Sequence, residues 1–188
     1  FNNAKNGIRL TTANNAVENR FMKVTNSFIK NNTLGGIDFK GLIFTVENTA
    51  FTLNRGFGGL RSRHKNLDGT GGISNRQISI LSSDFEHNGP YAIDIESGID
   101  VLVENCECLQ SQDVGITFAG CFKIGGVAGT AIYNAVFRNN FIRVPYAVYA
   151  DPHVAFDIRA EAIATEIKHT NWNIYDQAGQ TRFSDAGV

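Results

Sequence analysis

Two carboxylates, Asp94 and Glu96, stand two residues apart in a short segment where apolar and polar residues alternate. Hydrolysis of a glycosidic bond uses such a pair, because one carboxyl group protonates the leaving oxygen while the other activates water or attacks the sugar. On a β-strand both side chains would share one face, with their backbones about 6.6 Å apart. An inverting hydrolase needs a separation of roughly 6.5–9.5 Å. Asp94 and Glu96 are therefore candidate catalytic residues.

The segment that carries these carboxylates, AIDIES from Ala92, has the pattern of a half-buried strand. Ile93 and Ile95 alternate with Asp94 and Glu96, which places the apolar side chains on one face. The same pattern recurs in GITFAG from Gly115. A repeated strand of this kind indicates that the fold is built by stacking copies of one unit.

Seven segments align on this pattern, with their first apolar residues 23 to 33 positions apart. They are GIRLT from Gly7, GIDFK from Gly36, GLRSR from Gly59, AIDIE from Ala92, GITFA from Gly115, AVYAD from Ala147 and NIYDQ from Asn173. Before most of them lies another short strand that ends in a bulky residue: Phe28, Phe51, Phe85, Cys108 and Phe141. An Asn falls at the preceding turn in four cases, at Asn26, Asn48, Asn105 and Asn139. Asn tolerates the left-handed backbone of a sharp corner, and stacked Asn side chains can bond between layers.

Short strands, Asn corners and the absence of helical periodicity predict an all-β chain, a right-handed parallel β-helix of about seven coils. We expect one domain over residues 1–188, a fragment of a longer chain. The Gly-rich segments 64–75 and 121–134 are expected to be loop insertions. Residues 155–170 fit either a strand or a short helix. In its repeat length and its ladders of Ile, Leu, Val and Phe, the chain resembles the pectin-lyase-like superfamily.

Stacking would gather the outward residues of successive strands into polar columns. Asp38, two layers from Asp94 and about 9.6 Å away, becomes a third candidate catalytic residue. The candidate substrate-binding residues are Lys40, Arg61, Arg63, Thr117, Tyr149, Asp151 and Tyr175. Cations could clamp an anionic sugar, and tyrosines could stack on sugar rings. Alternating charges also stabilise neighbouring strands, and a cation such as Arg61 lowers a carboxyl pKa, so a purely structural ladder remains an alternative.

Composition narrows the classes of partner. A net charge of −1 argues against nucleic acid as the main partner, and no apolar run is long enough to span a membrane. The three cysteines, Cys106, Cys108 and Cys121, are odd in number and lack zinc-knuckle spacing. They are expected to be buried thiols, and no metal site is predicted.

Within this fold, the uneven coils and abundant Phe and Asn look most like phage tail-spike or tail-fibre proteins. That resemblance implies a homotrimer, on the virion tail or extracellular, that binds bacterial surface polysaccharide and hydrolyses it if it is an enzyme, without a cofactor. One alternative is a secreted polysaccharide lyase or C5-epimerase, with an Arg or Lys base and Ca²⁺ for a lyase. For this alternative, residues 149–153, YADPH, are similar to the Tyr-x-x-Asp-Pro-His-Asp signature of alginate C5-epimerases. A structural segment of a virion appendage without catalysis is the third interpretation.

Overall fold

The chain folds into stacked parallel strands. The computed structural model describes residues 4–11, 20–65, 69, 75–109, 119–127, 132–144, 154–159, 165–168, 171–174 and 183–185. These residues form nineteen strands in three parallel sheets and contain no helix. The predicted all-β parallel β-helix is confirmed. In the described residues there is accordingly no apolar helix that could cross a membrane.

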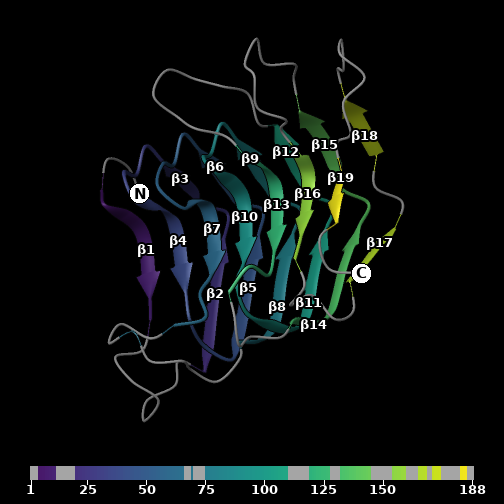
Figure 1. Cartoon of the computed structure of the whole chain (residues 1–188). Helices are drawn as coiled ribbons and strands as arrows, with labels where there is room; N and C mark the ends of the chain where they lie inside the picture. The colour runs from purple at the N-terminus through teal and green to yellow at the C-terminus, as the bar shows by residue number, and fades with distance from the viewer. Residues whose placement is uncertain are drawn as a thin grey trace.

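The first sheet contains seven strands, in agreement with the expected number of coils. In order along the sheet they are β1 (Asn6–Leu10), β4 (Gly35–Phe39), β7 (Gly58–Ser62), β10 (Tyr91–Ile95), β13 (Gly120–Ile124), β16 (Val154–Ile158) and β19 (Phe183–Asp185). Spatial order follows chain order throughout, as Figure 1 shows from the N-terminal to the C-terminal end.

Two further sheets of six strands complete the coils. The second contains β2 (Phe21–Thr25), β5 (Ile43–Glu47), β8 (Arg76–Leu81), β11 (Gly98–Glu104), β14 (Ile132–Arg138) and β17 (Thr165–Lys168). The third contains β3 (Phe28–Lys30), β6 (Ala50–Thr52), β9 (Asp84–Glu86), β12 (Glu107–Leu109), β15 (Phe141–Val144) and β18 (Asn171–Ile174). Each turn of the chain thus adds one strand to each sheet.

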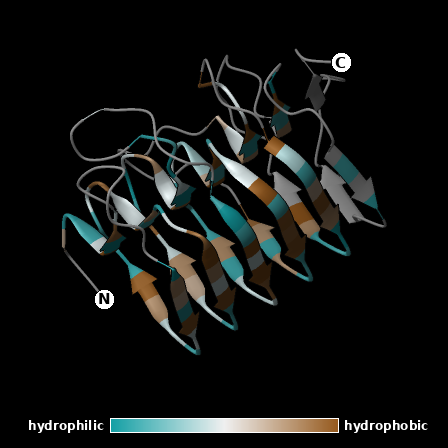
Figure 2. Ribbon diagram, turned by 90° about the horizontal axis from the view of Figure 1, so that it is seen from below, coloured by the Kyte–Doolittle hydropathy of each residue, from teal (hydrophilic) through white to brown (hydrophobic). Residues whose placement is uncertain are grey.

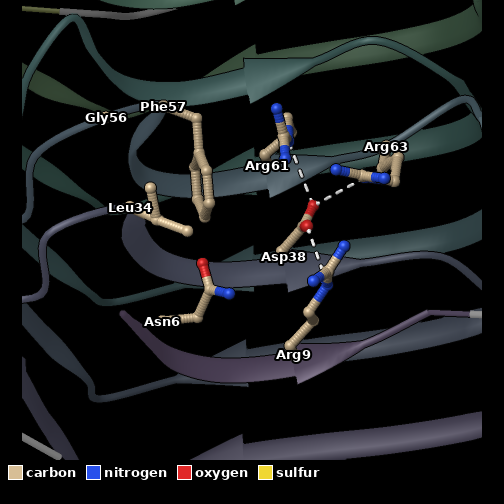
Figure 3. Close-up of a pocket in the computed structure, with 8 residues that line it drawn as sticks. All are labelled: Asn6, Arg9, Leu34, Asp38, Gly56, Phe57, Arg61 and Arg63. Atoms are coloured by element: carbon tan, nitrogen blue, oxygen red, sulfur yellow. Dashed lines mark hydrogen bonds and ion pairs between the residues drawn. The ribbon is translucent and has the colours of Figure 1, made fainter. Parts of the chain in front are cut away.

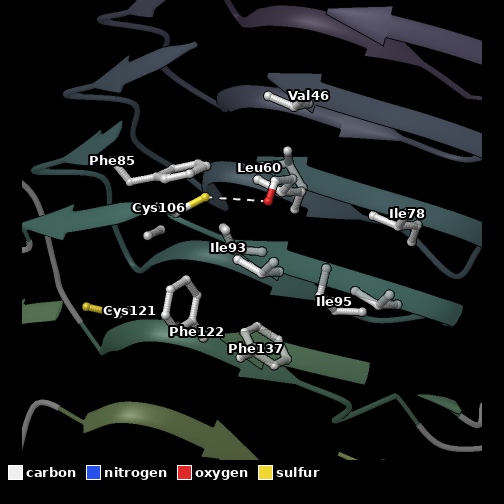
Figure 4. Close-up of a cluster of buried hydrophobic side chains, with 14 of the residues drawn as sticks. Val46, Leu60, Ile78, Phe85, Ile93, Ile95, Cys106, Cys121, Phe122 and Phe137 are labelled. Atoms are coloured by element: carbon white, nitrogen blue, oxygen red, sulfur yellow. Dashed lines mark hydrogen bonds between the residues drawn. The ribbon is translucent and has the colours of Figure 1, made fainter. Parts of the chain in front are cut away.

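Ladders of apolar side chains fill the space between the sheets. Phe51 and Phe85 stack with ring centroids 4.6 Å apart, and inward residues of all three sheets are fully buried. Figure 4 shows this cluster, and Figure 2 shows apolar and polar residues alternating along the strands. Cys106, Cys108 and Cys121 are free and buried here, as expected. Their role is to pack the core.

The corners between the second and third sheets have the predicted conformation. Asn26, Asn48, Asn105 and Asn139 have φ angles of 50°, 47°, 54° and 53°. Ser82 takes the same place in the remaining described coil, with φ 46°. Each of these residues donates its backbone N–H to a carbonyl of the next coil. The corners therefore satisfy backbone groups between layers.

A stack of Asn side chains lies at a different corner from the one predicted. Asn32 donates from Nδ2 to Oδ1 of Asn54 at 2.7 Å, and Asn54 donates likewise to Asn88 at 2.9 Å. All three are fully buried. They connect three successive coils between the third and the first sheet.

The predicted alignment is correct for the first four strands of the first sheet and wrong for the last three. Ile93 pairs with Phe122 in β13, so the fifth strand is Gly120–Ile124, which overlaps the segment 121–134 expected to be a loop. The sixth strand is Val154–Ile158 and the seventh Phe183–Asp185, while Asn173 and Ile174 belong to the third sheet. Uneven insertions shift each of these strands along the chain. GITFA and AVYAD lie largely outside the described residues.

Smaller differences concern the third sheet and residues 155–170. The register aligns Ile29 with Phe51 and Ile142 with Cys108, so the predicted alignment of Phe28 and Phe141 with these residues is wrong by one position. Phe28 is 50% exposed. Described residues of 155–170 are in strands β16 and β17, apart from Arg159. A shift of one residue in a strand moves a side chain to the other face.

Candidate functional site

A column of alternating charges runs across the first sheet. The register joins Arg9 to Asp38, Asp38 to Arg61, and Arg61 to Asp94, as predicted. It continues to Lys123 in β13 and Asp157 in β16. These six residues are called the charged column below. Neighbouring strands thus place opposite charges side by side, which stabilises their pairing.

Asp38 lies beneath three arginines. Its Oδ1 accepts from Arg61 Nε at 3.0 Å and from Arg63 Nε at 3.2 Å, and Oδ2 pairs with Arg9 Nε at 3.6 Å. The carboxylate side chain is only 2% exposed. Figure 3 shows the three guanidinium groups converging on it. Asp38 therefore fixes the position of the arginines.

The arginines form one side of an open pocket of about 230 Å³. Its wall also contains Asn6, Leu34, Gly56 and Phe57. The guanidinium carbon of Arg61 lies 4.3 Å from the centroid of the Phe57 ring, a cation–π contact. A Cβ atom at Gly35 would overlap that ring, so glycine is required behind the pocket wall. The pocket combines guanidinium donors with an aromatic surface (Figure 3).

Glu96, Lys40 and His64 extend the site beside the column. Glu96 Oε1 lies 3.8 Å from Arg61 Nη1, and Oε2 accepts from the backbone N–H of His64 at 3.1 Å. Burial of the imidazole, and next the charge of Lys40, lower the pKa of His64. Lys40 is itself buried. The site thus brings together the predicted residues Asp38, Lys40, Arg61, Arg63 and Glu96.

Within the charged column, Asp94 is the carboxylate whose pKa is raised. Burial raises the pKa of Asp94 to about 6, although Lys123 pairs with its Oδ2 at 3.1 Å. Its Oδ1 is buried and has no hydrogen-bond partner in the described part of the chain. Arg61 lowers the pKa of this acid, as expected, but desolvation outweighs Arg61 and Lys123, so the net shift is upward.

Asp157 belongs to a second cluster on the C-terminal side of Lys123. Its Oδ2 accepts from the Tyr91 hydroxyl at 2.7 Å and from Arg159 Nη2 at 2.6 Å. Burial, followed by this hydrogen bond, raises the pKa of Tyr91. Asp157 Oδ1 is buried and, like Asp94 Oδ1, lacks a partner among the described residues.

Four predicted residues, Thr117, Tyr149, Asp151 and Tyr175, lie outside the described residues. The predicted alignment would continue the column with Thr117, Tyr149 and Tyr175, and this is wrong, because Lys123, Asp157 and Ser184 follow Asp94 in the register. The sequence does contain a pattern that would have identified Lys123 and Asp157. A charged residue stands between two apolar ones in GCFKI and VAFDI, as it does in AIDI.

Comparison of the chain with protein-family models, with curated proteins and with solved structures gives no match.

Proposed function

We propose that the first sheet binds a polysaccharide along the charged column. The observation that carries this proposal is the pocket in which Arg9, Arg61 and Arg63 surround Asp38 beside Phe57. Guanidinium groups donate several hydrogen bonds in a fixed plane, and an aromatic face packs against the C–H groups of a sugar ring. An extended polymer could contact equivalent positions on successive strands.

A tail-spike or tail-fibre segment of the pectin-lyase-like superfamily is the biological setting that we propose for this surface. The parallel β-helix and its polar sheet face support it. The chain would then assemble as a homotrimer on a virion tail and bind polysaccharide of a bacterial surface. Light scattering tests the assembly, since a stable monomer would contradict the trimer without affecting polysaccharide binding.

Hydrolysis of the bound polymer is a second candidate function, favoured by the raised pKa of Asp94. A general acid works best when its pKa lies near the working pH, and a pKa of about 6 meets this condition. Glu96, two residues along, would serve as the base that activates water. Asp38 stays a predicted catalytic residue, but its contacts with three arginines suit it better to holding those side chains in place. The lyase and C5-epimerase alternatives stay predictions, since residues 149–153 lie outside the described residues.

The test is a screen of the full chain against purified bacterial surface polysaccharides. Binding is measured by calorimetry, and cleavage by release of reducing ends. We expect Asp94→Asn and Glu96→Gln each to lower cleavage at least about a hundredfold, while polymer still binds. Asp100→Asn is the matched control, because Asp100 is exposed on the second sheet, where it accepts from Asn134.

The outcomes separate the two functions. Binding without cleavage would contradict hydrolysis and leave polysaccharide binding standing. Cleavage that survives both substitutions would contradict the roles given to Asp94 and Glu96. An unsaturated product, detected by ultraviolet absorbance, would identify a lyase instead. No binding to any polymer would contradict the main proposal.

A further inference from the structure

We infer that the pocket beside Asp38 is a recognition site for the carboxylate group of an acidic sugar. The inference rests on the proposed polysaccharide binding and adds the chemical class of the polymer. It is carried by the charge balance of the pocket, by the way its arginines are anchored and by the surface opposite them (Figure 3).

The charges within the pocket do not balance. Arg9, Arg61 and Arg63 bring three positive charges to one carboxylate, and Glu96 supplies a second negative charge at 3.8 Å from Arg61. Asp94, the next carboxylate along the column, pairs with Lys123, so among the described residues one positive charge remains in excess. Like charges held this close repel one another, and the repulsion is larger where the groups are partly desolvated. A bound monoanion would remove the imbalance.

The anchoring of the arginines leaves donors for such an anion. Arg9 and Arg63 each pair with Asp38 through Nε. The contact of each runs through Nε–H, which is one of the five N–H donors of a guanidinium group. The two Nη groups of a guanidinium donate in parallel and match the two oxygens of a carboxylate. A group held by Nε is therefore oriented in advance for a second, bidentate contact.

Arg61 has a different role from its two neighbours. It is fixed on three sides, by Asp38 Oδ1, by Glu96 Oε1 and by the Phe57 ring. It serves as a positioning residue that holds the pocket wall and supplies charge. Leu34 and Phe57 form the apolar part of the lining. A sugar ring that carries one carboxylate would present both an anion and C–H groups to these surfaces.

The experiment compares polymers that differ only in their carboxyl groups. Alginate, polygalacturonate and hyaluronate are each tested in native form and after chemical reduction of the carboxylates to alcohols. Affinity for the full chain is measured by calorimetry at low and moderate salt. We expect binding of at least one native polymer, and binding of its reduced form weaker by about ten- to a hundredfold.

Two substitutions of Arg63 test whether this residue recognises the carboxylate of the polymer. Arg63→Gln removes the charge and the paired donors, and we expect it to weaken binding of the native polymer by about ten- to a hundredfold. Arg63→Lys keeps the charge but loses the planar pair of donors, and should have an intermediate effect. Arg138→Gln makes the same change of net charge on the second sheet, where Arg138 pairs with Glu104, and should bind like the unaltered chain. Circular dichroism verifies that each variant is folded.

The possible results distinguish this inference from the proposed function. Equal affinity for native and reduced polymers would overturn carboxylate recognition, while polysaccharide binding would stand. Equal weakening by Arg63→Gln and Arg138→Gln would show general charge attraction and also overturn the site. Failure of all three polymers to bind in either form would contradict both proposals together.

Discussion

Asp38 and Asp94 occupy equivalent positions two strands apart in one sheet, yet their surroundings give them opposite chemistry. Asp38 has cations on both oxygens, from Arg9, Arg61 and Arg63. Asp94 has Lys123 on one oxygen and no described partner on the other, and burial raises its pKa to about 6. The first fixes the position of three arginines, and the second keeps its proton up to about pH 6.

The difference shows that residues at equivalent positions of a repeated fold can have different surroundings. The register of the β-helix places the two side chains in the same column, each between two inward apolar residues in sequence. Their surroundings differ: Asp38 contacts Arg63, two residues beyond Arg61 along the chain, as well as Arg9 and Arg61, whereas burial dominates the pKa of Asp94.

Replacing Asp38 should have the largest effect on stability. Asp38→Asn leaves two partly buried guanidinium groups, those of Arg61 and Arg63, and the exposed one of Arg9 without their anion, which should lower the free energy of unfolding by about 3–5 kcal/mol. Urea denaturation at neutral pH measures the change. A loss below about 1 kcal/mol would show that the arginines do not depend on Asp38 and would weaken the contrast with Asp94.

Replacing Asp94 should change the way in which the free energy of unfolding depends on pH. The pKa of Asp94 is about 6 in the folded chain against an ordinary value of 3.8, so between these values the folded state binds more protons than the unfolded state. Its contribution to the free energy of unfolding is therefore greatest below the ordinary pKa. That contribution falls as the pH rises through about 6, by up to about 3 kcal/mol.

The measurement is the difference in unfolding free energy between the unaltered chain and Asp94→Asn. Asp84 titrates in the same direction, with a pKa of about 6, but its contribution cancels in that difference. Asn does not titrate, so the difference should move in favour of the variant as the pH rises from about 4 to about 7. A difference independent of pH would contradict the raised pKa.

Removing the Tyr91 hydroxyl should have a smaller effect. Tyr91→Phe deletes the hydrogen bond to Asp157 Oδ2 but leaves Arg159 in place. It also keeps the ring under Lys123, so we expect a loss of about 1–2 kcal/mol of unfolding free energy. Tyr133→Phe, at an exposed position of the second sheet, is the matched control. Equal losses in both variants would show that the second cluster is not held by this hydrogen bond.

The fold was predictable because each coil repeats simple physical requirements. Alternation in GIDF and AIDI identified strands of the first sheet, and Asn26, Asn48, Asn105 and Asn139 identified one set of corners. The fifth and later strands were not found, because insertions of different length separate them from those corners. A search for one charged residue between two apolar ones would have found Lys123 and Asp157.

The membership of the site was predictable only in part. Asp38, Arg61, Asp94 and Glu96 follow from the register of the first four strands. Their protonation does not follow, because it depends on which cation reaches which oxygen and on the burial of each carboxylate. The sequence places Arg61 between two acids, but only the structure shows that Arg63 also pairs with Asp38.

The most direct test of the contrast within the charged column is a carbon-13 NMR titration of the aspartate carboxyl groups, with Asp94→Asn used to assign the Asp94 signal. The structure predicts a midpoint of about 6 for Asp94. A midpoint at the ordinary value of 3.8 would show that Lys123 and Arg61 offset the burial, and would contradict the role of Asp94 as a proton-holding acid.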